Sequence, residues 1–171
     1  ENSNDEEFAG GIVAILETAT IENSKNTGNV IGSTNIGGIA GESKGTITQC
    51  RNDGQVSKVA GVICKTVNLG GLVGKNGEAA RLSNSKNYGN VNSETDTLVN
   101  LGGICGILYN NSIVELCENN GAISGSGKEI IPNEDTNTNC ASCTSNNGGS
   151  ASTDDFGQLN IGIIYGKYQE I

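Results

Sequence analysis

Two short motifs alternate along this chain, and their spacing limits the folds that it can adopt. The first motif is an apolar residue followed by Gly-Gly and further apolar or small residues; it occurs at residues 36–41, 69–74 and 101–106, with weaker copies at 9–14 and 161–166. The second has the form [Ile/Leu/Val]-x-x-[Ser/Cys]-x-Asn-x-Gly-x-[Val/Ile]; it occurs at residues 21–30, 47–56, 82–91 and 114–123. The first glycines of successive first motifs are 27, 33, 32 and then 60 residues apart.

A unit of this length, with short apolar runs between Asn and Gly turns, is typical of one coil of a β-solenoid. Ankyrin and tetratricopeptide repeats have similar lengths, but they need two helices each, which glycine-rich segments do not form. The sequence predicts an all-β fold, a right-handed parallel β-helix of about four to five coils with one long corner insertion. We expect residues 1–8 to form an acidic leader, residues 9–171 a single solenoid domain, and residues 124–159 the insertion loop.

Stacking of the coils predicts two apolar columns. Coils lie about 4.8 Å apart, so each residue rests on its equivalent in the next coil. The first column belongs to the first motif and consists of Ile12, Ile39, Leu72, Ile104 and Ile164. The second column closes the second motif and consists of Val30, Val56, Val91 and Ile123. Both columns are expected to face a narrow core.

The Asn-x-Gly positions predict a structural role for two further columns. The glycines are expected in turns that need positive φ; they are Gly28, Gly54, Gly89 and Gly121. The asparagines are expected to form a ladder in which each side-chain amide bonds to the next; they are Asn26, Asn52, Asn87 and Asn119. A simple turn preference of asparagine, without a ladder, is the alternative. Asparagine also precedes four of the first motifs, as Asn35, Asn68, Asn100 and Asn160.

Residues 70–77, Gly-Gly-Leu-Val-Gly-Lys-Asn-Gly, and residues 82–91, Leu-Ser-Asn-Ser-Lys-Asn-Tyr-Gly-Asn-Val, closely resemble the GLUG repeat. That repeat occurs in large bacterial surface and secreted proteins, including the non-catalytic parts of immunoglobulin A1-cleaving peptidases. The similarity covers residues 9–123 and 161–166. It implies an exported bacterial protein, at the cell surface or secreted, with a scaffold or adhesin-like role. The His-Glu-x-x-His zinc motif of those peptidases is absent, because the chain has no histidine.

Composition excludes several functions. Without histidine, Ser-His-Asp catalysis, Cys-His catalysis and histidine-ligated zinc are impossible. A net charge of −9 repels a phosphate backbone, so no nucleic-acid partner is expected. The longest apolar run, residues 12–16, is far shorter than the roughly 20 residues of a membrane span. We therefore expect no transmembrane segment, and we assign no catalytic residue, cofactor or metal site.

Five of the six cysteines fall into two groups, and the sixth, Cys64, lies in the 11-residue corner loop. Cys50 and Cys117 share a column with serines, and Cys105 shares one with valine and alanine, so all three are expected to be small buried side chains. Cys140 and Cys143 form a Cys-x-x-Cys in the insertion, where a local disulfide is expected in an extracellular setting. A zinc site would need a second cysteine pair nearby, and the remaining cysteines are scattered.

The corner between the second motif and the next first motif varies most in length, with gaps of 4, 11, 8 and 36 residues. Insertions of this kind collect at one edge of a solenoid, which is often its binding face. The longest gap, residues 124–159, is interpreted either as a linker or decoration or as a ligand-binding loop. Its carboxylates lack the spacing of calcium sites. Tyr88 and Tyr109 are candidate platforms for a sugar, with ordinary turn or capping residues as the alternative.

These observations favour a non-catalytic surface or secreted module, adhesin-like or scaffold, that binds a host or matrix glycan or a protein through its corner loops. The alternative is a polysaccharide-active or polysaccharide-binding β-helix, whose catalysis would need opposed carboxylates. An ice-binding solenoid would need regular Thr-x-Thr rows, which start at Thr18-x-Thr20 and Thr46-x-Thr48 and are then broken. Because solenoid ends expose unpaired strand edges, we expect a longer chain, end-to-end contacts, or a cap formed by residues 167–171.

Overall fold

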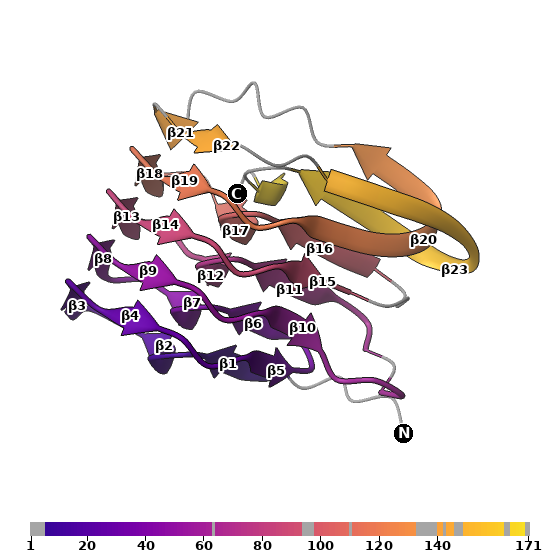
Figure 1. Cartoon of the computed structure of the whole chain (residues 1–171), viewed down its shortest axis with the longest axis horizontal. Helices are drawn as coiled ribbons and strands as arrows, with labels where there is room; N and C mark the ends of the chain where they lie inside the picture. Colours follow the sequence, from indigo (N-terminus) through magenta and orange to yellow (C-terminus); the bar gives the residue numbers. More distant parts are fainter. Residues whose placement is uncertain are drawn as a thin grey trace.

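The computed structural model describes residues 6–62, 64–93, 98–109, 111–132, 140–141, 143–145, 149–162 and 165–169. These residues form short strands that stack in parallel, in register, coil upon coil (Figure 1). The predicted all-β parallel solenoid is thereby confirmed. Among the same residues, no helix has the length and hydrophobicity that a membrane crossing requires.

Four parallel sheets run along the stack. The largest sheet joins, in spatial order, β1 (Phe8–Gly10), β6 (Asn35–Gly37), β11 (Val67–Gly70), β16 (Leu98–Gly102), β23 (Gly149–Gly162), β20 (Ile123–Pro132), β15 (Val91–Asn92), β10 (Val56–Lys58) and β5 (Val30–Gly32). The second consists of β2 (Val13–Leu16), β7 (Ala40–Ser43), β12 (Val73–Asn76), β17 (Cys105–Tyr109) and β24 (Tyr165–Gln169). The third consists of β3 (Thr20–Glu22), β8 (Thr46–Thr48), β13 (Arg81–Ser83), β18 (Ile113–Glu115) and β21 (Cys140–Ala141). The fourth consists of β4 (Lys25–Asn26), β9 (Arg51–Asn52), β14 (Lys86–Asn87), β19 (Glu118–Asn119) and β22 (Thr144–Ser145).

Each of the first four coils contributes one set of five strands, namely β1–β5, β6–β10, β11–β15 and β16–β20. The register brings equivalent repeat positions together, as the pairing of Val56 with both Val30 and Val91 shows. The apolar columns are accordingly buried in the middle of the stack, where Ile39, Leu72 and Ile104 have 0% exposure, whereas Ile12 on the first coil is 45% exposed. Ile164 lies outside the described residues.

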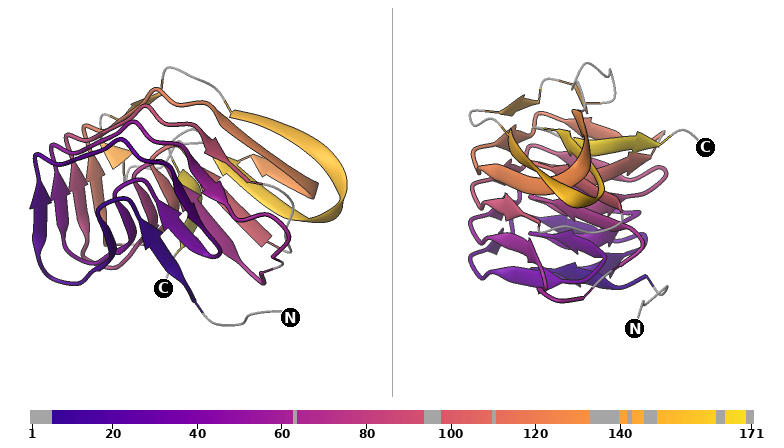
Figure 2. Two further views of the ribbon diagram at one scale, coloured as in Figure 1. Left: turned by 60° about the horizontal axis from the view of Figure 1, so that its bottom comes forward. Right: turned by 90° about the vertical axis from the view of Figure 1, so that its right-hand side faces the viewer.

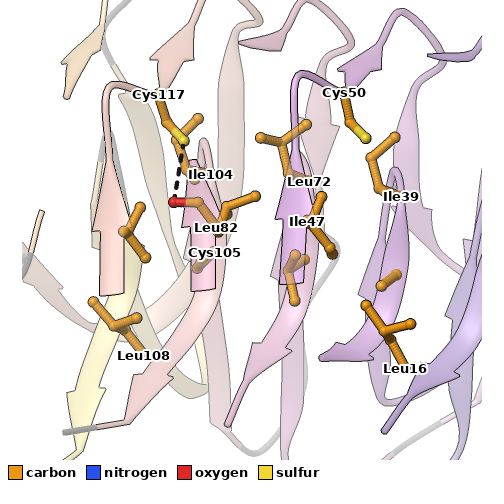
Figure 3. Close-up of a cluster of buried hydrophobic side chains, with 13 residues drawn as sticks. Leu16, Ile39, Ile47, Cys50, Leu72, Leu82, Ile104, Cys105, Leu108 and Cys117 are labelled. Carbon is orange, nitrogen blue, oxygen red and sulfur yellow. Dashed lines mark hydrogen bonds between the residues drawn. The ribbon is translucent and has the colours of Figure 1, made fainter. Parts of the chain in front are cut away.

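The interior contains two separate apolar cores. Core one lies between the second and third sheets (Figure 3) and contains Leu16, Ile39, Ala40, Ile47, Cys50, Leu72, Val73, Leu82, Ile104, Cys105, Leu108, Val114 and Cys117. Core two lies between the two arms of the largest sheet and contains Val30, Ile36, Val56, Cys64, Val67, Leu69, Val91, Val99, Leu101 and Ile123. The two cores are separated by a narrow polar layer, here called the waist.

The waist is where the Gly-Gly pair of the first motif meets the asparagine of the second. A Cβ at Gly38 would lie 2.2 Å from Asn52 Cγ, and one at Gly71 would lie 2.3 Å from Asn87 Nδ2. No side chain fits in that space, so the second glycine of each pair is required by the asparagine that packs on it. The two motifs, about 18 residues apart in sequence, are therefore coupled within each coil.

The prediction of positive φ at the Asn-x-Gly glycines is wrong. Among the described glycines, only Gly61 has φ in the left-handed region. Close stacking requires these glycines instead, because a Cβ at Gly54 would lie 1.9 Å from the carbonyl oxygen of Gly28, and one at Gly89 would lie 1.8 Å from that of Gly54. In each second motif, the residue with φ in the left-handed region is the one before the Ser/Cys position. It is not a glycine in any of the four copies; these residues are Asn23, Gln49, Asn84 and Leu116.

The long insertion corrects a second expectation, because its described part is mostly strand and not loop. Strands β21 and β22 lie on β18 and β19, and the start of β23 lies on β20. Cys140-x-x-Cys143-x-Ser145 keeps the spacing of the second motif, with cysteine in the apolar column and serine in place of asparagine. The insertion is therefore a degenerate further copy of that motif, which a strict pattern does not find.

The fifth coil is assembled from segments out of chain order. The end of β23 lies on β16 and β24 lies on β17, so these strands form its first half, after β21, β22 and the start of β23 have formed its second half. β20 and β23 project together from the stack as one long curved ribbon (Figure 2). The largest sheet has two arms, β1-β6-β11-β16 and β5-β10-β15, which β23 and β20 join at the C-terminal end of the stack. Both edge strands of the sheet, β1 and β5, therefore lie at the N-terminal end.

Candidate functional site

A groove with a cavity volume of about 400 Å³ lies over the corner at which β7, β12 and β17 end. Its lining carries two acidic side chains, two basic side chains, a tyrosine and a glycine; these are Glu42, Lys44, Lys75, Gly77, Glu78 and Tyr109. Each of the three strands supplies part of the lining, so the groove depends on the stacking of coils two, three and four.

The groove exists because one column of stacked residues, with long side chains in coils two and four, has a glycine in coil three. Lys44, Gly77 and Tyr109 occupy equivalent places at or just beyond the ends of β7, β12 and β17, as the register of the residues before them shows. Gly77 offers no side chain between the lysine and the tyrosine. A Cβ at Gly77 would approach Lys44 Cγ to 3.2 Å. The missing side chain leaves a hollow with a tyrosine on one side.

Lys75 and Glu42 pair in the centre of the groove. Lys75 Nζ lies 3.5 Å from Glu42 Oε1 and 3.1 Å from Glu6 Oε2, with side-chain exposures of 17% for Lys75 and 8% for Glu42. Burial opposes the charge on Lys75, but the hydrogen bond to Glu6 and the charges of Glu42 and Glu6 outweigh it, so the pKa of Lys75 is raised above its usual value. The lysine is a permanent cation at neutral pH.

A second lysine extends this charge network. Lys44 Nζ lies 3.3 Å from Glu17 Oε2 and 4.0 Å from Glu42 Oε2. The ammonium of Lys75 lies 6.0 Å from the centroid of the Tyr109 ring, at the outer range of a cation–π contact. The groove thus alternates donors and acceptors beside a half-buried aromatic ring, an arrangement that suits a hydroxyl-rich, uncharged ligand.

The other candidate aromatic residue, Tyr88, directly follows β14 of the fourth sheet. Tyr88 is 39% exposed, and the Arg51 guanidinium lies 4.2 Å from its ring centroid. Hydrogen bonds from Arg51 and Lys25 lower the pKa of Asp53 below its usual value, which shows that this face pairs its own charges. Because Arg51 covers one face of the ring, Tyr88 is a poorer platform for a sugar than Tyr109.

The asparagines of the second motif form a hydrogen-bonded ladder through the waist. Asn26 Nδ2 donates to Asn52 Oδ1 at 2.8 Å, Asn52 to Asn87 at 2.9 Å, and Asn87 to Asn119 at 2.8 Å. Asn119 Nδ2 then donates to Ser145 Oγ at 3.3 Å, so the ladder continues onto the degenerate copy of the motif. These bonds make the ladder an observed feature and not merely a turn preference.

Each rung of this ladder is also closed within its own turn. Asn87 Nδ2 donates to the carbonyl oxygen of Gly89 at 2.8 Å, and Asn87 Oδ1 accepts from the Gly89 N–H at 3.2 Å. A second ladder, through the asparagines before the first motif, runs in the opposite direction: Asn100 Nδ2 donates to Asn68 Oδ1 at 2.6 Å, and Asn68 Nδ2 to Asn35 Oδ1 at 2.8 Å. Both ladders are structural, because they are buried and satisfy their own polar atoms.

Five cysteine side chains lie in the part of the chain that the structure describes. Cys50, Cys64, Cys105 and Cys117 are buried and reduced. Burial raises the pKa of Cys117 to about 11 and that of Cys105 well above its usual value, so neither is a reactive thiolate at neutral pH. Cys143 is disulfide-bonded. The side chain of Cys140 lies outside those that the structure describes, so the Cys140–Cys143 pairing stays a prediction.

The threonine pairs do not form a regular array. Thr46 pairs with Thr20 and Arg81, and Thr48 pairs with Glu22 and Ser83. Charged side chains therefore interrupt both rows within one coil, which argues against ice binding. In the described part of the chain, no group of three or more Cys, Asp or Glu side chains could hold a metal ion.

Comparison with protein-family models, curated proteins and solved structures gives no match for this chain. The groove, apart from Tyr109, could not be expected from the sequence, in which the corner of variable length was the predicted binding face. One feature of the sequence could have indicated the groove. The residue directly after the first motif is Glu42, Lys75 and Ile107 in successive coils, although the motif itself is regular.

Proposed function

We propose that this chain is a non-catalytic, bacterial cell-surface or secreted repeat module of the GLUG type that binds a glycan in the groove beside Tyr109. The observation that carries this proposal is the groove itself, in which an aromatic ring stands next to two lysine–glutamate contacts. A charge-paired groove of this kind attracts no strongly charged ligand, whereas hydroxyl groups can accept from the lysines and donate to the carboxylates.

Two further observations support an exported location. The resemblance of residues 70–91 to the GLUG repeat implies a surface or secreted protein. A disulfide at Cys143 is expected in an oxidising compartment and is rare in the cytosol.

A glycan array, followed by calorimetry on the best ligand, tests this proposal. Tyr109→Ala is expected to weaken binding by at least about tenfold, because loss of an aromatic contact and its buried area costs about 1.4 kcal/mol or more. Tyr88→Ala, the matched control just after β14, is expected to leave affinity unchanged. Equal effects of the two substitutions, or no binding by the unaltered chain, would contradict a glycan site in this groove.

A polysaccharide-active enzyme is the second candidate, because two carboxylates, Glu42 and Glu78, line the same groove. Glycoside hydrolysis uses a pair of carboxylates on either side of the bond that is cleaved. Incubation of the protein with the glycans it binds, followed by measurement of new reducing ends, separates the two functions. Turnover that is abolished by both Glu78→Gln and Glu42→Gln would establish the enzyme; binding without turnover supports the module.

A further inference from the structure

A polar pair interrupts the apolar lining of core one. One column contains the last residues of β2, β7 and β12 and the next-to-last residue of β17; its side chains are Leu16, Ser43, Asn76 and Leu108. Asn76 pairs with Ser43 below it and with Leu108 above it in the register. Leu16 and Leu108 both belong to core one (Figure 3). Ser43 and Asn76 are each 0% exposed, so the two polar side chains are sealed between leucines.

These two side chains have three polar atoms without a partner. Ser43 Oγ, Asn76 Oδ1 and Asn76 Nδ2 form no hydrogen bond to any residue that the structure describes. In the asparagine ladder, by contrast, every amide is bonded to its neighbours. Each buried unpaired group costs about 1–3 kcal/mol. Three such atoms at adjacent rungs represent a large cost in a protein of ordinary stability.

Ser43 is also smaller than the leucines of the same column. Serine has two side-chain heavy atoms where the flanking leucines have four, so the column narrows at Ser43. A buried water typically makes about three hydrogen bonds to polar groups that are otherwise unsatisfied. We propose that a single water molecule is bound inside core one between coils two and three, donating to Asn76 Oδ1, accepting from Asn76 Nδ2 and bonded to Ser43 Oγ. Leu16 and Leu108 exclude further waters on either side.

The corner beside the groove controls exchange of this water. Gly77 follows Asn76, and its N–H donates to the carbonyl oxygen of Ser43 at 2.8 Å, which closes the two rungs against each other. Ala79, in the same corner, has φ of 57°, in the left-handed region that a residue with a side chain adopts at some cost. Escape of the water requires this corner to open, so its residence time is longer than that of surface water.

Magnetic relaxation dispersion of water oxygen-17 tests the proposal on the full chain. One long-lived internal water is expected in the unaltered protein, and none at this site in Ser43→Ala/Asn76→Leu, which continues the leucine column. Ser43→Ala alone keeps two of the three partners and is expected to shorten the residence time at least about tenfold, since loss of one hydrogen bond is worth about 1.4 kcal/mol. Ser57→Ala, on the partly exposed β10, is the matched control. Absence of a long-lived water, or a signal unchanged by the double substitution, would overturn the proposal.

Discussion

The first coil and the middle coils have the same Asn-x-Gly motif, but only in the middle coils does the neighbouring coil require its glycine. In the middle of the stack, the carbonyl oxygen of the coil beneath lies where a glycine Cβ would be, at 1.9 Å for Gly54 and 1.8 Å for Gly89. At Gly28 the nearest atom to such a Cβ is Asn26 Oδ1, at an ordinary contact distance of 3.7 Å. An identical residue is therefore required in one coil and optional in the other.

The same contrast holds for the asparagines and the apolar columns. Asn52 and Asn87 each accept from the asparagine beneath and donate to the one above, whereas Asn26 belongs to the first coil that the structure describes and begins the ladder as a donor. Ile12 is 45% exposed, and its equivalents in the next three coils are buried. The value of a repeat residue in a solenoid is set by its neighbours along the stack, so end and middle coils should respond differently to the same substitution.

Gly89→Ala is expected to have the largest effect. The added Cβ would overlap the backbone of coil three with that of coil two, and backbone cannot move aside as a side chain can. We expect the free energy of unfolding in urea to fall by about 3 kcal/mol or more. The matched change Gly28→Ala should alter it by less than about 1 kcal/mol. Similar losses for both variants would show that conformational freedom, and not stacking, explains these glycines.

Asn87→Asp is expected to come second. The substitution places a carboxylate at a fully buried rung, removes the donor to Asn119 Oδ1 and leaves two acceptors facing each other. An uncompensated buried charge costs about 3 kcal/mol at neutral pH. Asn26→Asp, at the end of the ladder, should cost less than half as much, because Asn26 is 7% exposed, against 0% for Asn87, and is the first donor of the ladder. Chemical denaturation of both variants measures the difference, and equal losses would mean that the ladder contributes no cooperative stability.

Leu116→Asn should stabilise the protein. Leu116 is exposed and has φ of 53°, and the equivalent residue of coil three is Asn84, with φ of 49°. A leucine in the left-handed region costs about 1–2 kcal/mol, part of which asparagine avoids. We expect a gain of about 0.5–1 kcal/mol for Leu116→Asn and a comparable loss for Asn84→Leu. Thermal unfolding of the pair measures both, and effects of the same sign in the two variants would refute this explanation.

The smallest effect is expected from Asp53 and depends on pH. Because the hydrogen bonds from Arg51 and Lys25 lower its folded-state pKa, Asp53 contributes stability above the unfolded pKa of about 3.9, and this is lost as pH falls through the folded value. Asp53→Asn should therefore reduce the acid sensitivity of the melting temperature between about pH 5 and pH 2. The background variant Arg51→Gln/Lys25→Gln serves as control. If Asp53→Asn changes the pH dependence of the melting temperature equally in that background, the ion pairs of Asp53 do not cause the acid sensitivity.

Much of the architecture could be predicted from particular residues. The columns of Val30, Val56, Val91 and Ile123 follow from spacing alone, because parallel stacking places equivalent positions on each other. The groove could not be predicted in this way. It depends on Gly77 lying between Lys44 and Tyr109 on adjacent coils, three residues that are far apart in sequence and do not share a motif. A strict repeat pattern also missed the copy at residues 140–149, in which Ser145 takes the asparagine position.

The sequence by itself determined the solenoid, the strand register and the identity of the stacked columns, because a periodic chain has only a few ways to bury equivalent residues together. Tertiary structure alone decided which glycines the stacking requires, where the waist divides the core, and how strands β21 to β24 share the last coil. Those features depend on how closely backbone of one coil approaches another. Such distances arise from the packing of whole coils, and no local pattern of residues encodes them.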